Sequence, residues 1–392
     1  MNATANTPQE QLSATATSRR RLTIGIPTCA DPSERRFPLT PEGARKLSER
    51  GYTVRIESDA AKAIHYSDNA YTRCAAEITD REGALSADIV IHLAPLPVAD
   101  IKRMRRGAML LTLSHLDTLT AEGVREMQER SIIGVAIDCI TDERGNFPFS
   151  DILAEIDGRS AIATSSSLLA DADKGKGILL GGIAGINPCE VTIIGSGIAA
   201  IAAARSASGL GAIIRMFDDD VYSLRAAVRD LGAQVIGSVI QERVLNHALQ
   251  SADVVIVTAP TSNLAIDAEE VNLMKKGVVI LDLTQNPGNT FPSLPKIDLA
   301  VARHNLEIKS DRRVCYINCG SSVPRTAAMA LSNTFNTMLD NIVTCDGLTN
   351  ALKLTPGLRN GVFTFLGKVT DPQVARIAGV RFTDINIFLQ LS

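Results

Sequence analysis

The sequence predicts an α/β fold with two Rossmann-like, doubly wound domains. Along most of the 392 residues, short apolar and β-branched runs alternate with helical patterns, as in parallel sheets that are covered by helices. One run, residues 191–194, is followed at once by two glycines and a helix, which is the pattern of a dinucleotide-binding unit. A chain of this length also has room for two domains.

The first part of the chain predicts an α/β domain of its own. Five apolar runs are expected to form strands: residues 21–27, 52–57, 87–93, 109–113 and 132–137. Helical patterns lie between them. One helix is expected to begin at Thr40, because threonine caps a helix, Pro41 suits the first turn and Glu42 complements the positive end of the helix dipole.

The second part predicts another set of strands and helices. Strands are expected at 191–194, 212–217, 252–258, 278–282 and 314–318, and helices at 151–172, 198–208, 221–232 and 327–343. The glycines within 174–185 favour a loop or small hairpin. The rest of the chain is predicted to be helical, with a break at Pro356-Gly357. The predicted domains are a substrate domain formed by 21–150 and 326–392, and a nucleotide domain over 151–325.

The glycine turn after residues 191–194 predicts a site for NAD. Gly195 allows the tight turn, and Gly197 lets a pyrophosphate approach the backbone. Ala200 takes the place of the third glycine of the usual pattern, where a small residue lets helix and strand pack closely. The N–H groups of Ser196, Ile198 and the following turn would face the phosphates with the positive end of the helix dipole.

An acidic residue completes this pattern. Asp218 ends the next apolar run, about 20 residues beyond the glycines, where a carboxylate binds the ribose hydroxyls of NAD and repels the extra phosphate of NADP. Asp219 and Asp220 follow directly, so some of these acids could simply face solvent. Further cofactor contacts are expected where the neighbouring strands end, because ligands of open α/β sheets collect there; they are Ala259, Leu283, Asn286, Asn318 and Cys319.

Composition and charge exclude several classes of function. The formal net charge is −3, so no basic field indicates a nucleic-acid partner. No apolar run is long enough to span a membrane. The seven cysteines are scattered, which favours reduced core thiols in a cytoplasmic protein, and no metal site is expected. Residues 1–20 predict a disordered extension; their terminal arginines leave a transit peptide as the alternative.

Three polar side chains of the first domain are candidates for chemistry. Arg36 has a planar fork that can hold a carboxylate, although it could also be a solvated loop charge. His115 follows an apolar strand and could exchange a proton with a substrate oxygen, although a core histidine is the ordinary alternative. Asp117 could orient His115 or cap the next helix. The other histidines show no partners in the sequence and are interpreted as structural; they are His65, His92, His247 and His304.

Taken together, these pieces resemble the alanine dehydrogenase family, which shares its fold with the NAD-binding subunit of proton-translocating transhydrogenase. The resemblance extends over about residues 22–379. The segments that carry it are ERRFPLTPEG at 34–43, APLP at 94–97, SHL at 114–116, EIDGRSA at 155–161, KGKGILLGGIAG at 174–185, VTIIGSGIAA at 191–200, LDL at 281–283 and VPRT at 323–326.

The resemblance implies a reversible, NAD-dependent oxidative deamination of a small L-amino acid, with alanine giving pyruvate and ammonium. In that family an arginine at the position of Arg36 grips the substrate carboxylate, and a histidine at the position of His115 interacts with the reacting oxygen. Its members are often homo-oligomers, so we expect a dimer or hexamer. The expected partners are an amino acid and the corresponding 2-oxo acid.

The sequence departs from the family pattern at two positions. Leu93 stands where the family has a lysine, and an amide, Gln285 or Asn286, stands where the family has an aspartate. An amide cannot act as a general base near neutral pH. The string QNPGN at 285–289 looks more like the transhydrogenase loop. Three hypotheses therefore remain: an oxidoreductase that acts on alanine or on a variant substrate, a non-catalytic NAD(H)-binding relative or sensor, and a transhydrogenase-like soluble subunit.

Overall fold

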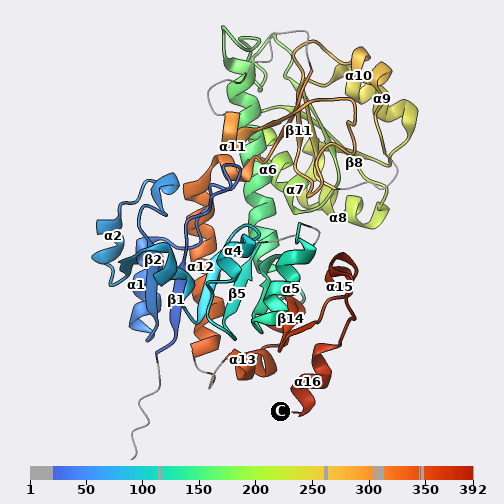
Figure 1. The fold of residues 1–392 in the computed structure, drawn as a ribbon. Helices are drawn as coiled ribbons and strands as arrows, with labels where there is room; N and C mark the ends of the chain where they lie inside the picture. The colour runs from blue at the N-terminus through green and yellow to red at the C-terminus, as the bar shows by residue number, and fades with distance from the viewer. Residues whose placement is uncertain are drawn as a thin grey trace, which may run out of the picture.

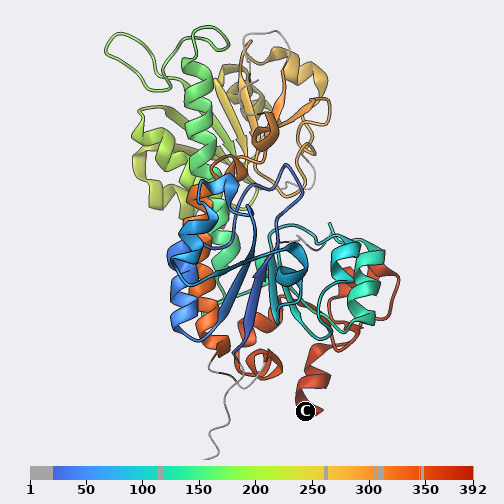
Figure 2. The same cartoon turned by 60° about the vertical axis from the view of Figure 1, so that its left-hand side comes forward.

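Two α/β domains lie one above the other and are joined by two long helices (Figure 1). The computed structural model describes residues 21–113, 116, 118–259, 264–302, 306, 313–343, 345 and 348–391. Two helices, α6 (Pro148–Ala170) and α12 (Pro324–Val343), run along each other where the domains meet, as both views show (Figures 1 and 2). The prediction of a two-domain α/β fold is confirmed.

The first domain has an eight-stranded sheet within the described residues, in the order β15-β14-β6-β5-β4-β1-β2-β3. Its strands are β1 (Thr23–Ile26), β2 (Thr53–Glu57), β3 (Glu77–Thr79), β4 (Ile89–His92), β5 (Met109–Thr112), β6 (Ile133–Ala136), β14 (Val362–Phe365) and β15 (Lys368–Val369). Strands β1 to β6 pair in parallel. Buried, β-branched residues of these strands form the core, as expected for a sheet covered on both faces.

The second domain has a seven-stranded sheet that is parallel throughout its described pairs, in the order β12-β13-β11-β10-β7-β8-β9. Its strands are β7 (Glu190–Ile194), β8 (Ile213–Phe217), β9 (Val235–Ser238), β10 (Val254–Val257), β11 (Val279–Asp282), β12 (Lys296–Asp298) and β13 (Cys315–Ile317). The predicted strands of both domains are confirmed, with ends that differ by at most two residues. Three short edge strands, β3, β9 and β12, were not predicted.

Helices cover both sheets. Those of the first domain are α1 (Pro41–Glu49), α2 (Asp68–Thr72), α3 (Arg81–Leu85), α4 (Val98–Ile101), α5 (Ala121–Glu129), α13 (Leu348–Leu354), α14 (Pro356–Asn360), α15 (Pro372–Ala378) and α16 (Ile385–Leu391). Those of the second are α7 (Ile198–Gly209), α8 (Val221–Leu231), α9 (Glu242–Ser251), α10 (Ala268–Leu273) and α11 (Leu299–Ala302). Thr40 caps α1 as predicted, since its side chain accepts from the N–H of Gly43.

The prediction that the remainder of the chain is helical is wrong for residues 362–369. Strands β14 and β15 form a hairpin there, and β14 pairs antiparallel with β6. Leu366 and Gly367 both have positive φ, as a two-residue hairpin turn requires. Phe363 and Phe365 are buried on opposite faces of the sheet, in two different core clusters. The aromatic and β-branched run Val-Phe-Thr-Phe between two glycines was a strand signal.

The long helix α6 belongs to both domains. Its first turns bury Phe149 and Leu153 in the core of the first domain, and its later turns bury Ile162 and Leu169 in the core of the second. At Gly158, α6 packs against α7 so closely that a Cβ atom would collide with a carbonyl of α7. The glycine of the EIDGRSA segment is therefore needed for the contact that places the second domain on its connecting helix.

Two further sequence predictions concern cysteines and membranes. None of the seven cysteines, all of which lie within the described residues, forms a disulfide bond. Three are buried, and Cys139 and Cys345 are partly buried against a core cluster. The prediction of core thiols is wrong for Cys29 and Cys74, which are partly buried and belong to none of the core clusters of the described residues. Within the described part of the chain, no helix combines the length and the apolar composition that crossing a membrane would need.

Candidate functional site

The glycine turn of the second domain has the geometry that its sequence predicts. Gly195 follows β7 with a φ of 109°, and a Cβ atom there would collide with Oγ1 of Thr258. Gly197 is exposed, and a Cβ atom there would meet no atom of the described residues within 4 Å. Helix α7 begins at Ile198 with no side chain capping it. Its first N–H groups are therefore available to an anion that approaches over Gly197.

Asp218 lies beside this turn. One of its carboxylate oxygens accepts from the hydroxyl of Ser196 at 2.7 Å, and the other accepts from the N–H of Asp220 at 2.9 Å. Asp220 has a different function, because its carboxylate caps α8 by accepting from the N–H groups of Tyr222 and Ser223. The structure thus distinguishes the consecutive acids: Asp220 stabilises a helix, and Asp218 faces the glycine turn.

A hollow of about 650 Å³ opens next to Asp218. Ser196, Gly197, Ile198 and Asp218 line it, and the Ile198 side chain is 42% exposed. Ala200 is fully buried within α7 and packs in the core of the domain, as a residue at a close helix–sheet contact should. Ala259 lies against Gly195 at the end of β10. The structure therefore brings these predicted residues together around one turn.

The loop after β11 is held by a carboxylate that the sequence analysis did not single out. Asp282 is 1% exposed and accepts from the backbone and the hydroxyl of Thr284 at 2.9 and 2.6 Å, and from the N–H of Gly288 at 2.7 Å. The loop places Leu283 in a partly buried position and Asn286 in an exposed one. Because Asp282 is engaged by these contacts, it shapes the loop.

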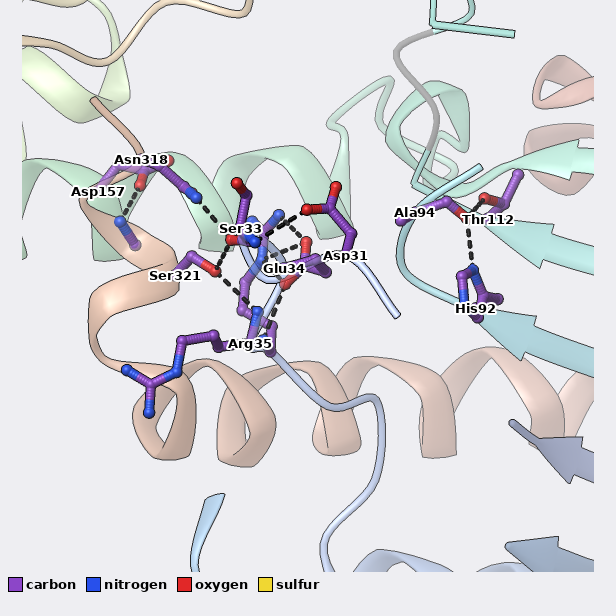
Figure 3. Close-up of polar contacts among 12 residues, drawn as sticks. Asp31, Ser33, Glu34, Arg35, His92, Ala94, Thr112, Asp157, Asn318 and Ser321 are labelled. Carbon is purple, nitrogen blue, oxygen red and sulfur yellow. Dashed lines mark hydrogen bonds and ion pairs between the residues drawn. The ribbon is translucent and has the colours of Figure 1, made fainter. Parts of the chain in front are cut away.

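The segment after β13 connects the two domains (Figure 3). The side-chain amide of Asn318 donates to the carbonyl of Ser33 at 2.6 Å, and the hydroxyl of Ser321 donates to the same carbonyl at 2.8 Å. The N–H of Gly320 donates to Asp157 on α6 at 2.6 Å. Cys319 is 1% exposed, and burial raises the pKa of its thiol well above the ordinary value. Its side chain thus packs in the core of the second domain.

Arg36 of the first domain is already paired with a carboxylate. Its Nε donates to both oxygens of Glu34, at 2.8 and 3.0 Å, and a terminal nitrogen forms a further short contact with the same group. The two side chains are only 13% and 7% exposed. Although burial acts against the charge, Glu34 raises the pKa of Arg36 above its ordinary value. A substrate carboxylate would have to share this guanidinium with Glu34 or displace it.

A cavity of about 480 Å³ lies over Arg36, at the carboxyl ends of β1, β2 and β4. Besides the ion pair, its lining includes Cys29, His65, His92 and Leu93. Burial raises the pKa of Cys29 to about 11, so its thiol is protonated near neutral pH. Leu93 is 4% exposed and packs with the domain core. Two candidates of the sequence analysis, His115 and Asp117, lie outside the described residues, as does His304.

His92 is a polar residue of this cavity that the sequence analysis interpreted as structural. It ends β4, and its Nδ1 lies 2.6 Å from the carbonyl of Ala94, which also accepts from Thr112 at 2.9 Å (Figure 3). Its Nε2 is buried and has no partner among the described residues. Burial lowers the pKa of His92 below its ordinary value. The available signal was a histidine as the last residue of a buried parallel strand, where ligands collect.

Comparison with known families matches both domains. The family described as "Alanine dehydrogenase/PNT, N-terminal domain" matches residues 25–156, and "Alanine dehydrogenase/PNT, C-terminal domain" matches residues 161–372. Similar proteins include an alanine dehydrogenase of Mycolicibacterium smegmatis, 28% identical over 385 residues, covering 94% of this chain and 100% of that protein. An alanine dehydrogenase of Mycobacterium tuberculosis is 27% identical over 371 residues, covering 93% and 98%.

Solved structures show the same fold. An L-alanine dehydrogenase superposes with a TM-score of 0.80 at 24% identity, covering 91% of this chain and 99% of that one. A transhydrogenase from Sinorhizobium meliloti superposes with a TM-score of 0.70 at 20% identity, covering 89% and 99%. Both similarities extend over the two domains and the helices that join them.

Proposed function

Since the chain belongs to the alanine dehydrogenase/PNT family, we propose that it is an NAD-dependent oxidoreductase that deaminates a small L-amino acid. The substrate is alanine, which NAD oxidises and water hydrolyses to pyruvate and ammonium with formation of NADH, or another small L-amino acid that reacts in the same way. The observation that carries the proposal is the turn in which Gly195 and Gly197 leave the start of α7 open and Ser196 holds Asp218 beside it.

The residues of this turn fit a dinucleotide. The open face at Gly197 is a cradle that a larger side chain would fill, and the uncapped start of α7 suits a pyrophosphate. The carboxylate of Asp218 suits the ribose hydroxyls. When bound, NAD accepts a hydride from the carbon that bears the amino group. Ala259, Leu283, Asn286, Asn318 and Cys319 are proposed to contact it from the neighbouring strand ends, Cys319 through its backbone.

The first domain would hold the substrate. Arg36 would bind its carboxylate by sharing or displacing Glu34, since a guanidinium fork matches a carboxylate in two parallel hydrogen bonds. His115 would polarise the reacting oxygen and move protons. Leu93 would present an apolar wall where the family has a lysine. The proposed partners are an amino acid and its 2-oxo acid, and a homo-oligomer, dimer or hexamer, is proposed by analogy with the family.

Specific observations favour two other functions. A non-catalytic NAD(H)-binding protein or sensor is supported by the Glu34–Arg36 pair, because a carboxylate already occupies the guanidinium. Leu93 and the exposed amide of Asn286 also favour this non-catalytic function. A transhydrogenase-like NAD-binding subunit is supported by the string at 285–289 and by the structural similarity to a transhydrogenase.

The test is NADH formation by the purified full chain, given NAD and a panel of L-amino and 2-hydroxy acids. NADH binding is measured in parallel by its fluorescence. We expect turnover with at least one L-amino acid, and reverse reaction with the matching 2-oxo acid and ammonium. Tight NADH binding without turnover in either direction would contradict the proposal and favour the non-catalytic function. Absence of NADH binding would contradict the cofactor assignment as well.

A further inference from the structure

His92 carries a hydrogen-bonding atom that the proposed function does not use. The residue lines the cavity over Arg36 and is 3% exposed. Its Nε2 is buried without a partner among the described residues. A buried polar atom without a hydrogen bond is costly and is rare in native proteins. His92 lines the cavity while its Nε2 is covered, so a ligand that fills the cavity and displaces the atoms over Nε2 could complete this hydrogen bond.

The backbone around His92 determines what its Nε2 can do. The neighbour of Nδ1 is the carbonyl of Ala94, which has no hydrogen to give, so Nδ1 must carry the proton and donate. Thr112, paired with His92 across β4 and β5, donates to the same carbonyl and holds it in place. In the neutral ring the proton on Nδ1 leaves a lone pair on Nε2. The unpaired atom is therefore an acceptor.

The surroundings keep the imidazole neutral. Burial is the main cause that lowers the pKa of His92, and the charge of Arg81 acts in the same direction. The bond to Ala94 and the charges of Asp100 and Glu34 act against it without reversing the direction. Arg81 itself is engaged by Asp100 and Glu57, and the guanidinium of Arg36 by Glu34.

We propose that Nε2 of His92 accepts a hydrogen bond from the amino or hydroxyl group of a 2-amino or 2-hydroxy acid bound in this cavity. The inference rests on the proposed function and names the substrate group that the cavity recognises. A 2-oxo acid has no such donor, so His92 favours the reduced substrate over the oxidised one. The neighbouring Leu93 adds to this preference, because it has no donor for the oxygen of a 2-oxo acid.

Two variants and a matched control test this contact. His92→Asn keeps an amide that can donate to Ala94 but has no atom at the place of Nε2. His92→Gln returns a hydrogen-bonding group near that place and should restore part of the affinity. His247→Asn is the control, because His247 lies exposed on α9 and outside the cavity lining.

The measurement is equilibrium binding of L-alanine, L-lactate and pyruvate to the full chain, with NADH present and ammonium absent so that no amination occurs. Relative to wild type, His92→Asn should bind L-alanine or L-lactate about tenfold more weakly, the effect of one lost hydrogen bond to a polar ligand, with pyruvate binding unchanged. The acid that loses more affinity identifies the donor as amino or hydroxyl. In parallel, the ¹⁵N resonance of Nε2, assigned by its loss in His92→Asn, should shift with the donor acids only.

The outcomes separate this inference from the proposed function. Turnover without any shift of the Nε2 resonance would overturn the inference and leave the proposed function standing. The same holds if His92→Asn loses equal affinity for all three acids. Binding that shifts Nε2 without NADH formation would support the contact and contradict the proposed activity. If none of the three acids moves the Nε2 resonance, the inference is overturned whatever the activity.

Discussion

The glycine turn of the second domain and the cavity of the first are assembled in different ways. At the turn, consecutive residues of one strand–turn–helix unit supply most of the site, and Asp218 joins them from the end of the next strand. The cavity draws its lining from three separate strand ends and the loop that holds Glu34 and Arg36. A site made from backbone geometry in one unit is readable in sequence, whereas one made from dispersed side chains depends on how each side chain is paired.

The largest expected effect tests the cavity through Arg36. Arg36→Ala should lower kcat/KM for the preferred amino acid on the order of 1000-fold, because the substrate carboxylate loses its partner and the buried Glu34 loses the cation that balances its charge. Binding of NADH should stay unchanged, since the residue is remote from the glycine turn in sequence and domain. Steady-state kinetics and an NADH titration measure the two effects.

The Arg36 variant needs a control for folding. Combining Glu34→Gln with Arg36→Ala removes the unpaired buried carboxylate, so thermal stability should partly recover while turnover stays low. Unchanged kcat/KM in Arg36→Ala would show that the guanidinium serves only Glu34 and would remove it from the substrate site.

The next prediction compares the two glycines of the turn. Gly195→Ala forces a side chain into a positive-φ position against Thr258, which should cost about 1–3 kcal/mol of stability and weaken NADH binding about 100-fold. Gly197→Ala would meet no atom within 4 Å in the described part of the chain, so its melting temperature should equal that of wild type while NADH binding still weakens. Equal melting losses in both variants would contradict the assignment of Gly197 to the ligand face.

A smaller effect tests the acid beside the turn. Asp218→Asn should weaken NADH binding about tenfold, because neutral amides bind the ribose hydroxyls less well than a carboxylate does, and should improve binding of NADPH relative to NADH. The exposed neighbour supplies the matched control, Asp219→Asn, which should change neither dissociation constant. If both variants lose the same affinity for NADH, Asp218 does not contact the cofactor.

The smallest effect tests the connection between the two regions. Ser321 donates to Ser33 and accepts from the N–H of Arg35 at 3.0 Å. Ser321→Ala should therefore loosen the loop that carries Arg36 and lower kcat/KM about threefold, with NADH binding unchanged. Ser322→Ala is the control, because its hydroxyl bonds only within the same short segment, to Cys319. Weaker NADH binding by Ser321→Ala would mean that the hydrogen bonds of Ser321 to Ser33 and Arg35 shape the cofactor site as well.

The sequence pattern predicted most of the fold because its signals were local. Period and β-branching located the principal strands, and Thr40 with Pro41 marked the start of α1. The prediction was wrong for β14, a four-residue strand set among helices. Its antiparallel pairing with β6 joins residues more than two hundred positions apart, and a short run of apolar residues does not by itself distinguish a strand from a turn of buried helix.

The same limit applies to the candidate site. Gly195, Gly197 and Asp218 could be predicted from sequence because spacing along one unit determines their geometry. The pairing of Arg36 with Glu34 was not predicted, although only one residue separates them, because a loop side chain can point in many directions. His92 was assigned a structural role because its lack of a partner is a property of the packed cavity, which no local pattern records.

By itself, the sequence determined the two-domain α/β architecture, the family and the glycine turn. Each of these follows from residue type and spacing over short stretches of chain. Only the tertiary structure decided that Arg36 is engaged by Glu34, that Asn318 and Ser321 join the domains, and that the buried Nε2 of His92, a residue of the cavity lining, has no partner among the described residues. These depend on which distant groups meet, and hydrogen bonds are selective for a partner's position as well as its chemistry.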